Sequence, residues 1–385
     1  MIRTDNFISE PAASSMKLAY PFDAFVFASG ETLGYLCSVT LHDQFLSPDA
    51  SIQAYRNGVP VIEELFDGVD IIVPISTPII KYGHLNSLGV PLLFPETGQV
   101  ALDMKQGLSL ESVLELLGKP HDFKSGLTSF QIDYLEAMRK AFPGKRVHWG
   151  WQWEGPVTTL WGLTGNDCMY GVYDDPELFE QCMEAIVSSL IEYAKFYCRI
   201  DGTSVLDPFP DHGRICDDIA AMFSPDIWKE FVLPYWKRYW REAPVPEIKL
   251  HCEDMKEKHL RLLDGLSITD YDPGISPYIN PEIIRKSTST PFCWRLGSFL
   301  YPQMSEDQCY DFAVQAAIDG ACYTFTAIEP MMCEAGIVKK IKSYYKGAQD
   351  VRKALLNGCS RLGLKKLLHC AYPEGYWETW EGFRK

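Results

Sequence analysis

The sequence lacks the features that mark several common classes of protein. No run of about 18 apolar residues occurs, so a membrane-spanning helix is not expected. No basic segment followed by an apolar one stands at the N-terminus, so the sequence predicts no signal peptide. Asp and Glu (51) outnumber Lys and Arg (36), which gives a net charge of −15. Because phosphate contacts need a basic surface, this balance argues against nucleic acid as a partner.

Two kinds of short motif are also missing. Neither GxGxxG nor GxxxxGK[ST] follows a strand-like segment, so a nucleotide-binding loop is not supported. The 12 cysteines include no CxxC pair and show no framework spacing. Scattered thiols without a signal peptide fit the reducing cytoplasm, where we expect this protein, and most of these thiols should be small buried residues.

The sequence does contain strand-like and helix-like segments in alternation. Strand candidates are residues 70–76, 146–152, 203–207, 247–251, 266–270, 291–296 and 321–326, with an eighth near 24–27. Helices are predicted after the caps Asp175-Pro176, Ser224-Pro225, Asn280-Pro281 and Ser305-Glu306. Seven or eight strand–helix units favour an α/β fold with a closed (β/α)₈ barrel of the TIM type over an open Rossmann sheet.

The domain boundary is expected near residue 360. Residues 1–360 would form the barrel with an N-terminal extension, and residues 361–385 a C-terminal tail. The tail carries Tyr376, Trp377, Trp380 and Phe383. It is predicted to pack on the barrel or on a partner subunit, which leaves a homodimer open.

One segment concentrates residues with metal-binding or proton-transfer chemistry. A strand-like run ends in His251, Cys252, Glu253 and Asp254. Because a strand alternates its side chains, His251 and Glu253 should share one face and Cys252 the other. The alternative is a solvated loop in which Glu253 and Asp254 begin a helix.

Active sites of barrel enzymes gather at the C-terminal ends of the strands. The side chains there that suit chemistry or binding are Trp151, Trp153, Asp207, Phe209, Asp211, His251, Glu253, Tyr271, Asp272, Cys293, Arg295 and Cys333. His251, Glu253, Cys293 and Cys333 together would make a four-ligand zinc-type site. Taken singly, the tryptophans suit core packing, Asp207 and Asp211 suit turns beside prolines, and the cysteines suit the core.

Several segments resemble the uroporphyrinogen decarboxylase superfamily over roughly residues 45–345. They are Val69–Val73, Glu154–Thr158, Tyr173–Glu177, Phe223–Tyr235, Leu250–His251 and Met304–Gln308. The resemblance implies a single (β/α)₈ barrel. The superfamily includes cobamide-dependent methyltransferases as well as the decarboxylase.

The departures from the decarboxylase pattern are informative. The arginine-rich Met-Arg-Gln-Ala-Gly-Arg segment of the decarboxylase has no counterpart near Leu41–Phe45. The decarboxylase aspartate falls at Thr77, and the late Gly-His-Gly-Ile corresponds to Phe325–Ile328, which has no histidine. Decarboxylation of a polyanionic porphyrinogen is therefore not expected.

The zinc-containing, thiol-methylating members of the superfamily resemble the chain better at His251. They read His-x-Cys-Gly, whereas Glu253 stands at the first cysteine position here and Thr326 at the second. An oxygen ligand in place of thiolate makes zinc a stronger Lewis acid, which suits a methyl ether.

The resemblance thus implies the methyltransferase component of an O-demethylase system. That component passes a methyl group from a small donor, a phenyl methyl ether, to the Co(I) corrinoid of a separate protein. Zinc would bind His251, Glu253, Cys293 and Cys333. Trp151, Trp153, Phe209, Tyr271 and Arg295 would bind the donor. Asp207, Asp211 or Asp272 would protonate or orient the leaving phenol.

Two other functions stay open at this point. One is methyl transfer involving a thiol or a methylamine on the same scaffold. The other is a non-catalytic binding subunit of a corrinoid complex. In each case the corrinoid is expected on a partner, because the chain has no Asp-x-His-x-x-Gly segment of the corrinoid-binding type.

Overall fold

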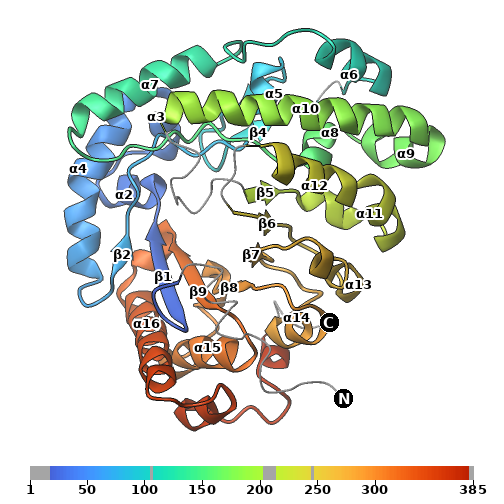
Figure 1. Ribbon diagram of the computed structural model, residues 1–385. Helices are drawn as coiled ribbons and strands as arrows, with labels where there is room; N and C mark the ends of the chain where they lie inside the picture. The colour runs from blue at the N-terminus through green and yellow to red at the C-terminus, as the bar shows by residue number, and fades with distance from the viewer. Residues whose placement is uncertain (1–17, 105–106, 203–213, 244–246, 381–385) are drawn as a thin grey trace. The chain divides into compact units, whose positions relative to one another are not determined.

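The structure, a computed structural model, describes residues 18–104, 107–202, 214–243 and 247–380. It is an α/β fold with parallel strands (Figure 1). The chain divides into two compact units. Unit 1 consists of Met1–Thr32, Val59–Val73 and Lys249–Lys385, and unit 2 of Leu33–Gly58 and Pro74–Ile248. Within the described residues, no helix is both long enough and apolar enough to cross a membrane.

Unit 1 is built on parallel strands that follow one another from β6 to β2. Pairings join β6 to β7, β8 to β9, β9 to β1 and β1 to β2, and a bridge from Tyr271 to Phe292 joins β7 to the start of β8. The strands are β1 (Asp23–Ala28), β2 (Ile71–Ile72), β6 (Lys249–His251), β7 (Asp270–Asp272), β8 (Cys293–Arg295) and β9 (Tyr323–Ile328).

Helices α15 and α16 pack on one face of β1 and β9 (Figure 1). On that face Val26, Thr324 and Thr326 are fully buried, and the Tyr344 hydroxyl of α16 donates to Thr324 Oγ1 at 2.7 Å. The helices of unit 1 are α13 (Glu257–Leu260), α14 (Pro281–Ser287), α15 (Glu306–Ile318) and α16 (Ala335–Leu356). Its 3₁₀ turns are η2 (Leu263–Gly265), η3 (Ser298–Leu300), η4 (Pro330–Cys333), η5 (Leu362–Leu367) and η6 (Trp377–Thr379).

The C-terminal tail packs on α15 within unit 1. The buried Asp311 carboxylate accepts hydrogen bonds from the backbone N–H groups of His369 and Cys370 and from the Tyr372 hydroxyl, at 2.8–2.9 Å. The Trp377 indole N–H donates to Asp319 at 2.8 Å. The described residues of the tail therefore contact α15 and Asp319 of the same chain.

Unit 2 is mainly helical. It contains α3 (Leu41–Leu46), α5 (Gly83–Ser87), α6 (Leu110–Leu117), α7 (Thr128–Ala141), α8 (Pro156–Thr164), α9 (Asp167–Asp174), α10 (Pro176–Asp201), η1 (Asp218–Met222), α11 (Pro225–Phe231) and α12 (Leu233–Glu242). Its strands are β3 (Leu92–Leu93), β4 (Ala101–Leu102) and β5 (Arg214–Cys216). Helices α2 (Gly30–Leu36) and α4 (Pro48–Leu65) contribute residues to both units.

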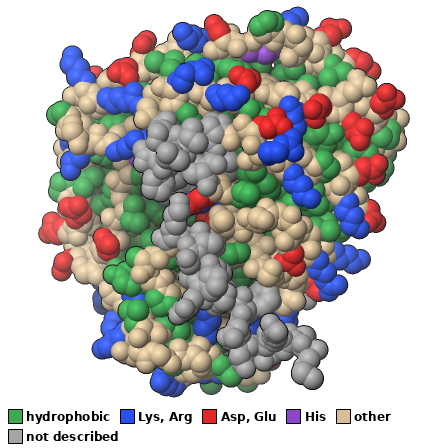
Figure 2. Space-filling view, viewed as in Figure 1, with side chains coloured by type: hydrophobic (Ala, Val, Ile, Leu, Met, Phe, Trp, Pro, Cys, Tyr) green, Lys and Arg blue, Asp and Glu red, His purple; other side chains and the backbone are tan. Residues whose placement is uncertain are grey.

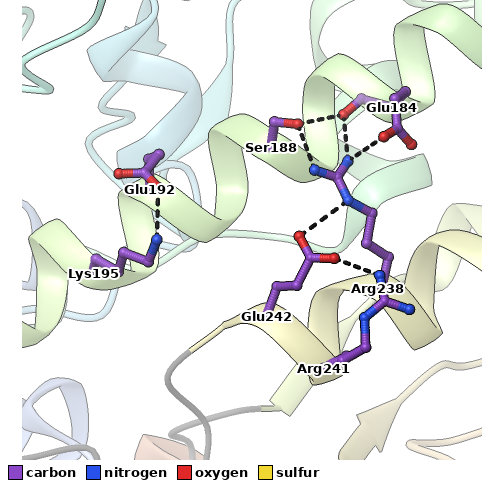
Figure 3. Close-up of polar contacts among 7 residues, drawn as sticks. All are labelled: Glu184, Ser188, Glu192, Lys195, Arg238, Arg241 and Glu242. Carbon is purple, nitrogen blue, oxygen red and sulfur yellow. Dashed lines mark hydrogen bonds and ion pairs between the residues drawn. The ribbon is translucent and has the colours of Figure 1, made fainter.

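A single arginine connects α12 to α10 in unit 2 (Figure 3). The Arg238 guanidinium donates to the Glu184 carbonyl at 3.0 Å and to Ser188 Oγ at 2.9 Å, and it pairs with the Glu184 carboxylate at 2.8 Å. It also donates to Glu242 on its own helix at 3.2 Å. Figure 2 shows Lys and Arg interspersed with Asp and Glu on the face in view, as small mixed clusters of this kind would produce.

The predicted helix caps are confirmed. The side chains of Asp175, Ser224, Asn280 and Ser305 each accept a hydrogen bond from the backbone N–H three residues later. The predicted helix after Ser224 is wrong in one respect, since it divides at Val232 into α11 and α12. Pro234 explains the break, because proline lacks an N–H and its ring clashes with the carbonyl four residues earlier.

The predicted strands are partly displaced. The candidate at 24–27 is confirmed as β1, whereas the candidate at 266–270 begins only at Asp270, because Ser267 has a φ of 54° and lies in a turn. The candidate at 146–152 forms only the isolated bridges of His148 and Trp151. Strand β5 and the β3–β4 pair were not predicted. The candidate at 203–207 lies outside the described residues.

Candidate functional site

The site in unit 1 is centred on His251, the last residue of β6. Burial alternates along this segment: Leu250 and Cys252 are fully buried, and His251 and Glu253 are half-buried. His251 Nε2 lies 3.8 Å from Glu253 Oε1. The two side chains therefore share a face, as strand alternation predicts, and Cys252 points into the core.

Asp272 fixes the other ring nitrogen of His251. The two residues are paired on neighbouring strands, and His251 Nδ1 lies 3.0 Å from Asp272 Oδ2. The second carboxylate oxygen of Asp272 accepts the Gly274 backbone N–H at 3.0 Å. A carboxylate on Nδ1 sets the tautomer and orientation of the ring, so that Nε2 is directed at whatever binds beside Glu253.

The turn after β7 also supports Glu253. The Ile275 N–H donates to Glu253 Oε1 at 3.4 Å. Gly274 has a φ of 59°, and a Cβ atom there would overlap the Glu253 carboxylate. Glycine is therefore required twice, for the backbone conformation and for the space that Glu253 occupies. One turn thus holds both carboxylates that flank His251.

The two predicted cysteines lie on different parts of unit 1. Cys293 begins β8 and is fully buried, one residue beyond the bridge that joins Phe292 to Tyr271. Because paired parallel strands stay in register, Cys293 lies beside Asp272 on the neighbouring strand. Cys333 ends η4, and burial raises the pKa of its thiol to about 11.

Arg295 lies two residues beyond Cys293 on β8. Its guanidinium Nη2 is 3.9 Å from Glu329 Oε1, and the two side chains are 28% and 43% exposed. The pair is long and accessible, so it contributes little stability. It does offset the positive charge of Arg295 within the site.

Four aromatic residues on β1 and β9 were missed by the sequence analysis. Phe25, Phe27, Tyr323 and Phe325 alternate with fully buried residues and are themselves half-buried. Their alternation with small or branched residues in Asp23–Ala28 and Tyr323–Ile328 was the signal that could have revealed them.

The other predicted donor-binding residues have different surroundings. Trp151 is fully buried in unit 2, and its indole N–H donates to Thr128 Oγ1 at 3.0 Å. Tyr271 is fully buried in unit 1, and its hydroxyl donates to the Cys252 carbonyl at 3.4 Å. A residue that stacks on a ligand needs an accessible face, which neither ring has. Asp207, Phe209 and Asp211 lie outside the described residues.

Trp153 borders a cleft in unit 2. The cleft is lined by residues that include Ser76, Lys81, His148, Trp153, Tyr197 and Arg214. The Trp153 indole N–H donates to the Tyr239 hydroxyl at 3.0 Å, and its ring meets Tyr197 edge-on.

Thr77, at the position of the decarboxylase aspartate, is fully buried, and its hydroxyl accepts the Gly150 N–H at 2.8 Å. Thr77 is therefore a structural residue here.

The fit to a zinc ion is partial. Across the part of the chain that the structure describes, no three His, Cys, Asp or Glu side chains are grouped as metal ligands. His251 and Glu253 do supply one nitrogen and one oxygen, both of which zinc accepts. Asp272 occupies the place of the outer carboxylate that usually orients a metal-bound histidine.

Comparison with known proteins agrees with this architecture. No curated protein matches the chain. Among solved structures, a methyltransferase from Methanosarcina mazei is similar in fold, with a TM-score of 0.62 and 14% sequence identity over 90% of this chain and 98% of that one. The sequence profile of the uroporphyrinogen decarboxylase (URO-D) family matches residues 77–274, which is more than half of the chain. The chain therefore belongs to the URO-D family.

Proposed function

We propose that this protein is a methyltransferase that takes a methyl group from a small donor, an aromatic methyl ether, and passes it to the Co(I) of a separate corrinoid protein. The proposed scaffold is a (β/α)₈ barrel. Membership of the URO-D family and the fold shared with a methyltransferase support the general activity. The observation that carries the proposal is the His251 imidazole held between Asp272 and Glu253 at the strand ends.

His251 and Glu253 would hold a zinc ion, with Cys293 or Cys333 as further ligands. When bound, zinc would act as a Lewis acid on the donor oxygen. The chain's own contribution is to orient His251. With Asp272 on Nδ1, the imidazole keeps its proton there and presents Nε2 as a lone pair. Because Asp272 is engaged with His251 and Gly274, we assign it an orienting role, and Asp207 or Asp211 remain the proposed acids for the leaving phenol.

A methylammonium donor is the second candidate. Aromatic rings beside carboxylates attract organic cations. In unit 1, Tyr323 and Phe325 lie on β9, next to the strand of Arg295, which in turn is bridged to the strand of Asp272. The ether remains first because an oxygen ligand such as Glu253, in place of a thiolate, suits Lewis-acid activation of an ether oxygen.

The test uses the purified chain, a Co(I) corrinoid protein, a reductant and a panel of donors. With methoxylated aromatics we expect the phenol and the absorbance of methyl-cobalt. Transfer confined to thiols or methylamines would reject the ether and keep the methyltransferase. Absence of transfer from every donor would instead support a binding subunit. Coproporphyrinogen formed from uroporphyrinogen would contradict the proposal in favour of the decarboxylase.

The histidine can be tested directly. His251→Ala should reduce methyl transfer by ~10³-fold, because it removes the group that the two carboxylates position. Zinc content, expected at about one per chain in protein prepared without chelators, should also fall. Cys252→Ala is the matched control, since its side chain points to the opposite face. Equal losses of metal and activity in the two variants would contradict the assignment of faces.

A further inference from the structure

Four aromatic rings form a continuous patch on one face of β1 and β9. The register pairs Phe25 with Phe325. Tyr323 lies two residues before Phe325, and Phe27 lies two residues after Phe25. Each ring contacts two others: the centroid distances are 5.2 Å for Phe25–Tyr323, 6.4 Å for Tyr323–Phe325, 6.3 Å for Phe325–Phe27 and 6.2 Å for Phe27–Phe25. We call these four residues the aromatic patch.

The aromatic patch is not closed core. On the opposite face of the same strands, Val26, Thr326 and Ile328 are at most 1% exposed, beneath α15 and α16. All four rings of the patch keep accessible surface. An apolar surface of this kind inside a fold gains free energy when an apolar ligand covers it.

The aromatic patch and His251 belong to the same face of unit 1. Side chains at paired positions of neighbouring strands point the same way, and the pairings run from His251–Asp272 through the start of β8 to β9. The Tyr323 hydroxyl reaches across β8 to the Asp270 carboxylate at 3.2 Å. The aromatic patch is therefore linked through Tyr323 to β7, the strand that carries Asp272.

We propose that the aromatic patch is the binding surface for the flat ring of the methyl donor, and that the donor ring carries no anionic group. This inference rests on the proposed function. The ring would lie against Phe25 and Phe325, with its ether oxygen toward His251. Carboxylates on this side of unit 1 (Glu253, Asp270, Asp272 and Glu329) outnumber the cations Lys249 and Arg295, and Glu329 offsets the charge of Arg295. A carboxylate on the donor ring would face repulsion there.

The test measures binding to the purified chain without corrinoid protein, by calorimetry. The probes are methoxybenzene, its saturated analogue methoxycyclohexane and 4-methoxybenzoate. Methoxybenzene should bind several-fold more tightly than either of the others. Phe325→Leu keeps an apolar side chain of similar volume but removes the ring, so affinity for methoxybenzene should fall about 3- to 10-fold. Phe25→Leu should act in the same way and serves if Phe325→Leu does not fold.

The matched control is Phe130→Leu on α7, where the ring is 40% exposed and lies in unit 2. It should leave affinity unchanged. Equal binding of the ring and its saturated analogue, or no loss in both patch variants, would overturn the proposal. Tighter binding of 4-methoxybenzoate than of methoxybenzene would overturn its charge preference. Binding of methoxybenzene without methyl transfer would contradict the proposed function but not the role of the aromatic patch. Methyl transfer with an unchanged KM for the donor in both patch variants would contradict the role of the aromatic patch but not the proposed function.

Discussion

Asp217 in unit 2 and Asp272 in unit 1 are both buried carboxylates, but they face different partners. Asp217 is fully buried and accepts the backbone N–H groups of Val157 and Thr158 at 3.2 and 2.7 Å, and the Trp236 indole N–H at 2.7 Å. Every one of these donors is neutral and fixed. Asp217 thereby closes the N-terminus of α8 and ties it to α12.

Asp272 instead lies beside a titratable ring that is 20% exposed. Its partners include the Gly274 backbone N–H and His251, whose other nitrogen is directed at Glu253. A buried carboxylate that accepts hydrogen bonds from backbone, indole and hydroxyl groups of the core stabilises the fold. A buried carboxylate beside a partly exposed imidazole, such as Asp272 beside His251, orients a group that can bind a ligand. The partners of a buried acid, more than its burial, separate a structural role from a functional one.

The largest expected effect is on the stability of unit 2. Asp217→Ala should lower the free energy of unfolding by about 3 kcal/mol, because three donors would be left without an acceptor in a region closed to water. Urea denaturation measures this. A loss below about 1 kcal/mol would mean that water replaces the carboxylate. That result would contradict the structural role assigned to Asp217.

The pH dependence of stability sharpens the assignment of Asp217. Burial raises its pKa from the ordinary 3.8 to about 6, against the hydrogen bonds from Trp236, Thr158 and Val157, which lower it. The stability contributed by its protonated form is complete below pH 3.8 and is lost as the pH rises through about 6. Asp217→Asn stays neutral throughout. Between pH 4 and pH 7 the variant should therefore gain roughly 3 kcal/mol relative to the wild type.

Urea denaturation of both proteins at several pH values tests this. A constant difference between the two would show that Asp217 does not titrate in this range.

A smaller effect is expected at Asp272, and on function only. Asp272→Asn should reduce zinc affinity or methyl transfer ~10- to 100-fold, because the amide no longer fixes the His251 tautomer. The melting temperature should change little compared with that of Asp217→Ala. A fall in stability as large as that of Asp217→Ala, with activity per folded molecule unchanged, would show that Asp272 has a structural role like that of Asp217.

The smallest expected effect concerns the turn that holds both carboxylates. Gly274→Ala should lower methyl transfer about tenfold, since the new methyl group displaces Glu253. Gly68→Ala is the matched control: Gly68 also has a positive φ, 86°, but a Cβ atom there meets nothing within 4 Å. The double variant Gly274→Ala with Glu253→Asp should recover part of the loss, because the carboxylate is shorter. Equal losses in the two glycine variants would leave only backbone strain as the cause.

Sequence reasoning located the parts of the site that depend on strand periodicity. It placed His251 and Glu253 on one face and Cys252 on the other, because the alternation of β6 continues to Glu253. The same reasoning does not extend to Trp151, which makes only an isolated bridge to Ile80, so no ladder fixes the face of its neighbours. Alternation is a guide only where the ladder of hydrogen bonds continues.

The remaining features depend on contacts between distant segments. The partnership of His251 with Asp272 requires the register of β6 on β7, and local patterns do not determine register. The aromatic patch needs β1 and β9 to pair, although both were recognised as strand candidates. Asp217 could not be identified because its partners come from α8 and α12.

The pairing of β1 with β9 has a consequence for how the protein is made. β1 has a near neighbour and a distant one: Val26 pairs with Ile71 of β2, whereas Asp23 pairs with Tyr323 of β9, roughly 300 residues later in synthesis. Pro74–Ile248 of unit 2 is one continuous segment and can begin to fold while translation continues. Unit 1 must wait for β9 to leave the ribosome, and until then the edge of β1 that pairs with β9 has no partner strand. The aromatic patch therefore forms only at the end of synthesis, when β9 brings Tyr323 and Phe325 beside Phe25 and Phe27.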